Sequence, residues 1–228
     1  MKRKITVTVL SAAALAAVAP YAMTAPEPFE VAIKWELEFE YEAPLPIQVT
    51  LPGEKKPRVF WYMLYTVTNR TRDDITGRGT DRDFIPGFVV YTETGQAINA
   101  NWRVSSTVFQ AVKKRHNRPL LKNHANITGK ILFGKDNAKD GAIIWPDFDP
   151  DAGSFDVFVG GLSGETAELK LPAPVTVTEI DAFGKAKTVK TDKIVLSKTL
   201  QLNYTVKGQA EDRIFTRATF NYKRWVMR

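Results

Sequence analysis

The sequence predicts a mainly β protein, an antiparallel β-sandwich with one short crossover helix near residues 104–116. Residues 60–69 form an unbroken aromatic and β-branched run, which is typical of a buried strand. Short alternating segments, separated by turn residues about every eight to fifteen positions, are typical of a sandwich. Only residues 104–116 have helical periodicity. These three observations define the predicted fold class.

The run at residues 60–69 is expected at the centre of a sheet. Read with a period of two, one of its faces carries Phe60, Tyr62 and Leu64. The other face carries Trp61, Met63, Tyr65 and Val67. Because both faces are apolar, other elements must cover both of them. We expect residues 104–116 to cover the face of Trp61, Met63 and Tyr65.

Residues 104–116 are predicted to form a helix whose apolar stripe carries Val104, Val108, Ala111 and Val112. Ser105 or Ser106 can cap its start, and the basic residues 113–115 suit the negative end of the helix dipole. Thr107 and the valines would also allow a strand.

The remaining pattern is that of strands and turns. Residues 31–41 alternate strictly between apolar and charged side chains, which predicts a long strand with one buried face. Residues 175–191 read as a hairpin, and residues 134–141 as a hairpin loop or a loop between sheets. No repeat or change of composition marks a boundary, so residues 26–228 are expected to form a single β-sandwich domain.

Residues 1–25 are predicted to be a signal peptide. Lys2, Arg3 and Lys4 precede an apolar, alanine-rich stretch of about fifteen residues, which is short for a membrane span. Cleavage after Ala19 or after Thr24 would fit, and an uncleaved anchor is the alternative. No later apolar run is long enough to span a membrane. The expected location is therefore the periplasm or the extracellular space.

Charge and cysteine content exclude several classes of function. Removing residues 1–25 takes away three basic and no acidic residues, so the net charge falls from +7 to +4. This modest charge favours solubility but does not indicate nucleic-acid binding. The chain has no cysteine, which excludes thiol nucleophiles and cysteine-ligated zinc.

Asp147, Asp149 and Asp151 have the opening spacing of a calcium loop. They are the candidate metal ligands of this chain, and calcium is the only cofactor that the sequence indicates. Ala152 stands where such a loop needs glycine, and Phe158 stands where it needs a bidentate glutamate. A solvated turn is the competing interpretation.

No catalytic constellation is evident. The two histidines, His116 and His124, lack the spacing of a helical metal pair. Ser163 lies outside any Gly-x-Ser-x-Gly pattern, and no phosphate-binding glycine loop occurs. In the charged loop of residues 70–83, aspartates and arginines are interspersed and are expected to neutralise one another. The basic run at residues 113–118 is interpreted as a solvated helix end.

Three segments resemble one family of proteins. The strand 61–69 ends in Thr68-Asn69, the strand at 88–91 leads into the turn Glu93-Thr94-Gly95, and residues 155–163 form a later strand. Together, over about a third of the mature chain, they resemble uncharacterised exported bacterial immunoglobulin-like domains. The resemblance implies an immunoglobulin-like sandwich in an extracytoplasmic setting, and it implies no catalytic residues.

The predicted function is that of an exported, non-catalytic structural or binding module of the cell envelope or extracellular space. Its partner would be a protein or a glycan, contacted through loops 70–83 and 134–141 or through aromatic residues such as Trp102 and Trp225. The alternative is a carbohydrate-binding or carbohydrate-processing protein that uses loop aspartates beside an exposed tryptophan. Processing would require two carboxyl groups about 5–10 Å apart in a cleft.

Overall fold

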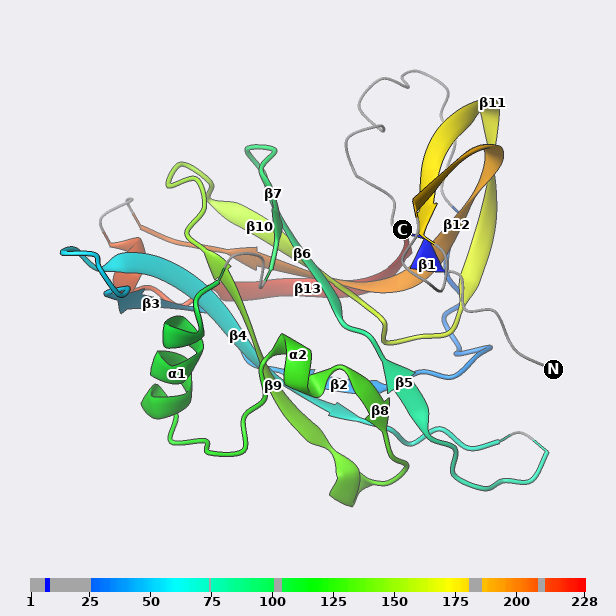
Figure 1. Cartoon of the computed structure of the whole chain (residues 1–228), viewed down its shortest axis with the longest axis horizontal. Coiled ribbons are helices and arrows are strands. Elements are labelled where there is room, and N and C mark those ends of the chain that lie inside the picture. Colours follow the sequence, from blue (N-terminus) through cyan, green and yellow to red (C-terminus); the bar gives the residue numbers. More distant parts are fainter. Residues whose placement is uncertain (1–6, 9–25, 74, 101–103, 181–185, 209–211) are drawn as a thin grey trace. The chain divides into compact units, whose positions relative to one another are not determined.

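The computed structural model describes residues 7–8, 26–73, 75–100, 104–180, 186–208 and 212–228 (Figure 1). The chain is mainly β with antiparallel sheets and few helices, as the sequence predicts. It divides into two compact units. Unit 1 comprises residues 1–27, 166–197 and 227–228, and unit 2 comprises residues 28–165 and 198–226. Each is described by itself, and the single-domain expectation for residues 26–228 stays a prediction.

The first sheet of unit 2 is built around β4 (Arg58–Thr68). On one side β4 pairs with β9 (Lys139–Pro146), which places Trp61 opposite Trp145. On the other side it pairs with β2 (Glu38–Tyr41) and β3 (Leu45–Val49), one after the other. The aromatic run at residues 60–69 is therefore the central strand that its two apolar faces predict.

In the described residues, the second sheet of unit 2 contains five strands. Its order is β7 (Ala97–Asn99), β6 (Gly87–Thr92), β10 (Ser154–Gly160), the second half of β12 (Ala186–Thr205) and β13 (Thr219–Met227). Alternate residues of β10 are buried, because this strand shows only one face to the first sheet. A small separate ladder joins β5 (Arg82–Phe84) to β8 (Gly129–Ile131).

The two faces of β4 contribute to two different cores. Trp61, Met63, Tyr65 and Val67 pack against residues of the second sheet such as Val157. Phe60, Tyr62 and Leu64 pack against the helix side chains Val108, Phe109 and Val112. The expectation that the helix covers the Trp61 face is therefore wrong. Alternation alone shows that both faces are covered, but it does not show by which element.

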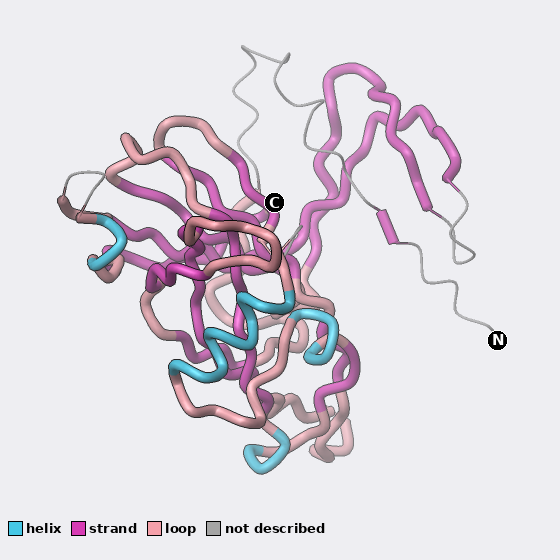
Figure 2. Tube along the Cα trace, turned by 60° about the vertical axis from the view of Figure 1, so that its left-hand side comes forward, coloured by secondary structure: helices cyan, strands magenta, loops and turns pink. Residues whose placement is uncertain are grey.

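Helix α1 (Ser106–Arg115) confirms the predicted helix. Of the two candidate caps it is Ser105 that acts, because its Oγ accepts a hydrogen bond of 3.2 Å from the Thr107 N–H. A short second helix, α2 (His124–Ile127), is capped in the same way by Asn123. Figure 2 shows the few helical segments in cyan within a chain that is mostly strand and loop.

The strand predicted at residues 31–41 is shorter than expected. Only Glu38–Tyr41 forms a strand, and the side chains of Val31 and Ile33 are 79% and 53% exposed. Glu38 lies opposite Thr68, the last residue of β4. Residues before Glu38 therefore find no partner on β4, and only Glu36 makes an isolated bridge.

Residues 134–138 prove to be a loop between sheets, and residues 139–141 already belong to β9. β8, before the loop, pairs with β5, whereas β9, after it, pairs with β4. A 3-10 turn, η2 (Lys135–Asn137), lies inside the loop. A second 3-10 turn, η3 (Arg213–Phe215), precedes β13.

Unit 1 contains the hairpin predicted around residues 175–191. β11 (Thr166–Ile180) pairs with the first half of β12, with Ile180 opposite Ala186 and one register shift between Lys170 and Val175. The expected turn at residues 183–184 lies outside the described residues. β1 (Val7–Thr8) pairs with the end of β11. The other residues of the expected signal peptide are not described, so the signal peptide stays a prediction.

None of the helices in the described residues is both long and apolar enough to cross a membrane.

Candidate functional site

The two loops singled out by the sequence, 70–83 and 134–141, meet in unit 2 beyond the end of β4. Asn69 joins them: its backbone carbonyl accepts a 2.9 Å hydrogen bond from the Gly134 N–H. Its side chain is fully buried, and Nδ2 donates to the carbonyls of Thr80 and Ile131 at 2.8 and 3.0 Å. Oδ1 accepts from the Thr71 N–H at 2.9 Å. We call residues 69–73, 75–83 and 132–138 the loop platform.

The first loop of the platform is folded back on itself as a small hairpin. The Asp73 N–H donates to the Arg78 carbonyl at 2.8 Å, and the Thr80 N–H donates to the Thr71 carbonyl at 3.1 Å. Gly77, with a φ of 65°, supplies the left-handed conformation that the turn needs. The apolar side chain of Ile75 at the tip is 94% exposed. The loop therefore presents an apolar tip on a hydrogen-bonded base.

Asp73 stabilises this tip through its carboxylate. Oδ1 accepts hydrogen bonds from the N–H of Thr76 at 2.7 Å, from the Thr76 hydroxyl at 2.9 Å and from the Ile75 N–H at 3.1 Å. These bonds, with the Thr76 N–H contributing most, lower the pKa of Asp73 below its ordinary value. Asp73 is thus satisfied mainly within its own turn, and Arg82 acts on it only at a distance.

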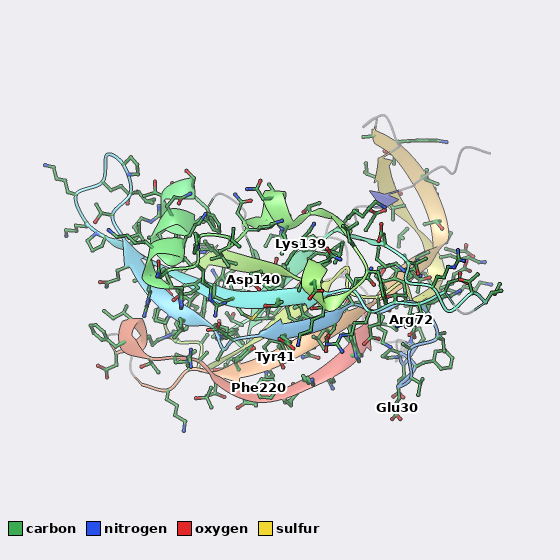
Figure 3. All side chains as sticks on the ribbon, turned by 90° about the horizontal axis from the view of Figure 1, so that it is seen from below. Glu30, Tyr41, Arg72, Lys139, Asp140 and Phe220 are labelled. Carbon is green, nitrogen blue, oxygen red and sulfur yellow. The ribbon has the colours of Figure 1, made fainter. Side chains whose placement is uncertain are left out.

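Phe133 ties the second loop to the first. The guanidinium of Arg72 lies 5.2 Å from the centre of the Phe133 ring, and the Phe133 N–H donates to Asp81 Oδ1 at 3.1 Å. A methyl group on Gly79 would overlap the ring, so only glycine allows this packing. Figure 3 shows Arg72 near this end of unit 2.

The three candidate calcium ligands lie around an arginine. Asp147 Oδ1 accepts from the Trp61 indole at 2.9 Å, and Asp149 Oδ1 accepts from the Asp151 N–H at 3.0 Å. The side chain of Arg213 is buried above the Phe148 ring, 4.7 Å from its centre, and donates to the Asp149 carbonyl at 2.8 Å.

Burial lowers the pKa of Arg213, and the three aspartates oppose that shift, so a protein cation already lies among these carboxylates. The pKa of Asp149 is lowered, chiefly by its bond from the Asp151 N–H. In the described part of the chain, no three acidic or histidine side chains converge as metal ligands do.

Calcium at Asp147, Asp149 and Asp151 stays a prediction, and thermal unfolding tests it. With Arg213 among the carboxylates, we expect the same melting temperature in excess calcium and in chelator. An ion that binds only the folded state would raise it.

This turn is also no cleft for a sugar. The hollow beside it, lined by Trp61, Asp147 and Arg213 among others, has a volume of about 20 Å³. That is room for one water molecule. Carbohydrate processing by these aspartates therefore has no support in their geometry.

The two histidines occupy different places. His116 Nε2 lies 2.8 Å from the Tyr62 hydroxyl, at the end of α1. His124 begins α2. Burial lowers the pKa of both below the ordinary value of 6.5.

The aromatic residues expected at a contact surface are only partly described. Trp225 is half-buried beneath Lys198, whose Nζ lies 5.2 Å from the ring centre. Trp102 lies outside the described residues. Exposed aromatic side chains among the described residues are Phe220 and Tyr222 on β13, each 43% exposed, together with Phe29 at 60% and Phe215 at 85%. Phe220 lies 6.2 Å from Tyr41 on β2, measured between ring centres (Figure 3).

The basic run at residues 113–118 is partly engaged within unit 2. Arg115 donates to the Pro46 carbonyl at 2.8 Å, and Arg118 forms an ion pair of 2.8 Å with Glu42. This pairing supports the interpretation of the run as a helix end.

A buried ion cluster in unit 2 was not predicted. Lys198 is 1% exposed, and its Nζ lies 3.1 Å from Glu165 and 3.4 Å from Glu36. Lys198 also donates to the Phe29 carbonyl at 2.8 Å, while Glu165 accepts from the Phe29 N–H at 2.9 Å. The pair thus holds the backbone of the N-terminal segment. In the sequence, Lys198 follows a run of exposed lysines and carries no sign of burial.

Comparisons of the chain with protein-family models, with curated proteins and with solved structures found no match. The functional argument therefore depends on the fold and its contacts.

Proposed function

We propose that the protein is an exported, non-catalytic binding module of immunoglobulin-like type, acting in the periplasm or outside the cell. Its binding surface is the loop platform, and its partner is a protein. Loops at the end of a sandwich are a common location for such surfaces, because the sheets hold them rigidly.

The observation that carries this proposal is the 94% exposed Ile75 at the tip of a loop that is internally hydrogen-bonded. When an apolar side chain this exposed enters a partner's pocket, its apolar surface is removed from water, and this favours binding. Because the described residues of this loop are held by hydrogen bonds, little conformational entropy is lost on binding. Ile75 therefore has the properties of an anchor residue.

The charges of the platform indicate the chemistry of the partner. Asp73 and Asp81 already accept hydrogen bonds from backbone N–H groups. The aspartates keep their negative charge, and the exposed Arg72 and Arg78 add positive charge in the same loop as Ile75. A partner surface with an apolar pocket and an acidic rim would be complementary.

A capture experiment with three forms of the mature chain tests the proposal. Immobilised wild type, Ile75→Asp and Leu120→Asp are incubated with the envelope fraction of the source cell, and bound proteins are identified. Leu120 is an equally suitable site for a charge, since it is 83% exposed and lies outside the platform. We expect Ile75→Asp to lose at least about 90% of the captured partner, as for a central anchor, and Leu120→Asp to retain it.

Equal capture by all three forms would exclude the platform as the binding surface. Absence of any captured protein would contradict the function itself.

Glycan binding is the second candidate, and the exposed aromatics of β13 favour it. Phe220 and Tyr222 are each 43% exposed on β13, and the ring of Tyr41 lies 6.2 Å from that of Phe220. If this surface binds polysaccharide, Phe220→Ala and Tyr222→Ala will each reduce retardation in affinity electrophoresis, whereas Ile75→Asp will not. Unchanged migration of the wild type in every polysaccharide tested would exclude glycan binding by this surface.

A further inference from the structure

Three arginines from two distant parts of unit 2 lie along residues 42–46, where the chain passes from β2 to β3. We call Arg115, Arg118 and Arg217 the arginine patch. We propose that the arginine patch binds the acidic groups of a polysaccharide. The inference rests on the second candidate function, glycan binding near Phe220, and specifies that the glycan is acidic.

Arg115 and Arg118, at and just beyond the end of α1, are positioned by contacts with the same stretch of chain. Arg115 Nη1 donates to the Pro46 carbonyl at 2.8 Å, and Arg118 Nη2 lies 2.8 Å from Glu42 Oε1. Arg115 is exposed, and the side chain of Arg118 is 41% exposed. A guanidinium carries five N–H donors, so each of these arginines keeps donors for a ligand.

Arg217 joins them from the segment before β13. The N–H of its neighbour Ala218 donates to the Pro44 carbonyl at 3.1 Å, which places Arg217 beside the other two. Burial lowers the pKa of His116, Glu42 opposes that shift, and all three arginines of the patch add to it. Because electrostatic effects weaken with distance, the three guanidinium groups lie around this one imidazole.

The arginine patch carries more positive charge than its neighbours neutralise. The basic residues 113–114 add two cations in the last turn of α1. At the end of β2, Glu42 is already paired with Arg118, and Glu40 is one further carboxylate. Arg217 is exposed, and within the described part of the chain its side chain forms no hydrogen bond or ion pair. Its planar guanidinium can therefore accept a carboxylate or phosphate group in a two-pronged contact.

Aromatic rings next to the arginine patch favour a sugar polymer as the source of these acidic groups. Tyr41 directly precedes Glu42, Phe220 follows Arg217 by three residues, and the two ring centres lie 6.2 Å apart (Figure 3). Aromatic rings offer flat apolar area against which a sugar ring can pack. An acidic polysaccharide would thus contact rings and cations together.

Affinity electrophoresis of the mature chain with two polymers tests the inference. The polymers are polygalacturonate and fully methyl-esterified polygalacturonate, which share the same sugar rings and differ in charge. We expect the wild type to bind polygalacturonate about tenfold more tightly, because only this polymer offers carboxylates to the arginines.

Three variants separate the roles of charge and ring. Arg217→Gln should weaken polygalacturonate binding about fivefold and leave binding of the ester unchanged. Lys130→Gln removes one charge from exposed β8, outside the patch, and should bind both polymers like wild type. Phe220→Ala should weaken both polymers equally. Circular dichroism checks that each variant is folded.

Equal affinity of the wild type for the two polymers would overturn the inference and leave the glycan candidate standing. Retardation by neither polymer would remove that candidate as well. Equal losses in Arg217→Gln and Lys130→Gln would show that net charge, rather than the arginine patch, attracts the polymer. Arg217-dependent binding to phosphatidylglycerol vesicles, with none to polygalacturonate, would overturn the assignment to a polysaccharide.

Discussion

Asn69 links three backbone segments from a fully buried position at the end of β4. Its side chain satisfies two carbonyls and one N–H that water cannot reach easily. A buried backbone group that loses its partner costs much more than an exposed one. Local order in the loop platform therefore depends on this amide.

Asn69→Ala should lower the free energy of unfolding by about 3 kcal/mol, because several backbone groups lose their partner. Asn137→Ala is the control: its amide makes one exposed bond to the Phe133 carbonyl, and its loss should cost about 0.5 kcal/mol. Urea unfolding measures both. Similar losses of unfolding free energy in the two variants would show that Asn69 does not hold the three backbone segments together.

Lys198 and Lys193 allow a direct comparison of a buried and an exposed ion pair. Lys198→Met leaves Glu165 buried without its cation and should cost about 3–5 kcal/mol. Lys193 pairs with Glu168 at 3.1 Å, but both side chains are more than half exposed, so Lys193→Met should change stability by less than about 1 kcal/mol. Chemical denaturation gives both values. A small loss of stability in Lys198→Met would mean that water reaches the Glu165 carboxylate.

At the scale of elements, the sequence specifies α1 well. The periodicity of its apolar residues and its capping serines are local signals, and the helix forms where they predict it. Its packing was predicted wrongly, because Trp61 and Tyr62 lie on opposite faces of one strand and are equally apolar. Which face the helix covers depends on where the second sheet lies.

The contribution of the α1 cap to the stability of the protein can be measured. Ser105→Ala removes the side-chain bond to the Thr107 N–H and should destabilise the protein by about 1 kcal/mol. Ser106→Ala, one residue later, should have an effect within about 0.5 kcal/mol. Thermal unfolding followed by circular dichroism compares them. If Ser106→Ala proves the more harmful, the cap has been assigned to the wrong serine.

At the scale of the whole molecule, the two histidines link stability to pH. Burial lowers the pKa of His116 and of His124 in the folded state below the ordinary value of 6.5. As pH falls, the unfolded chain takes up protons before the folded chain does, so folding loses stability. The contribution is fully present above pH 6.5 and is lost as pH falls through the folded pKa values.

The double variant His116→Gln/His124→Gln should therefore show a flatter dependence of unfolding free energy on pH between about 7 and 5. Urea titrations at several pH values measure it. Carboxylates such as Asp73 and Asp149, whose pKa values are also lowered, act below that range in both proteins. If the unfolding free energy of wild type and variant changes equally with pH, the two histidines do not cause the pH dependence.

The sequence by itself determined the fold class, the central strand and the helix, because each depends on periodicity within a short segment. It also indicated loops 70–83 and 134–141, since turn residues and charges mark exposed ends. Only the tertiary structure decided that these loops share Asn69 and Phe133, that Arg213 lies among Asp147, Asp149 and Asp151, and that α1 faces Tyr62. These contacts join residues distant in the chain, and no local pattern encodes which distant segments will meet.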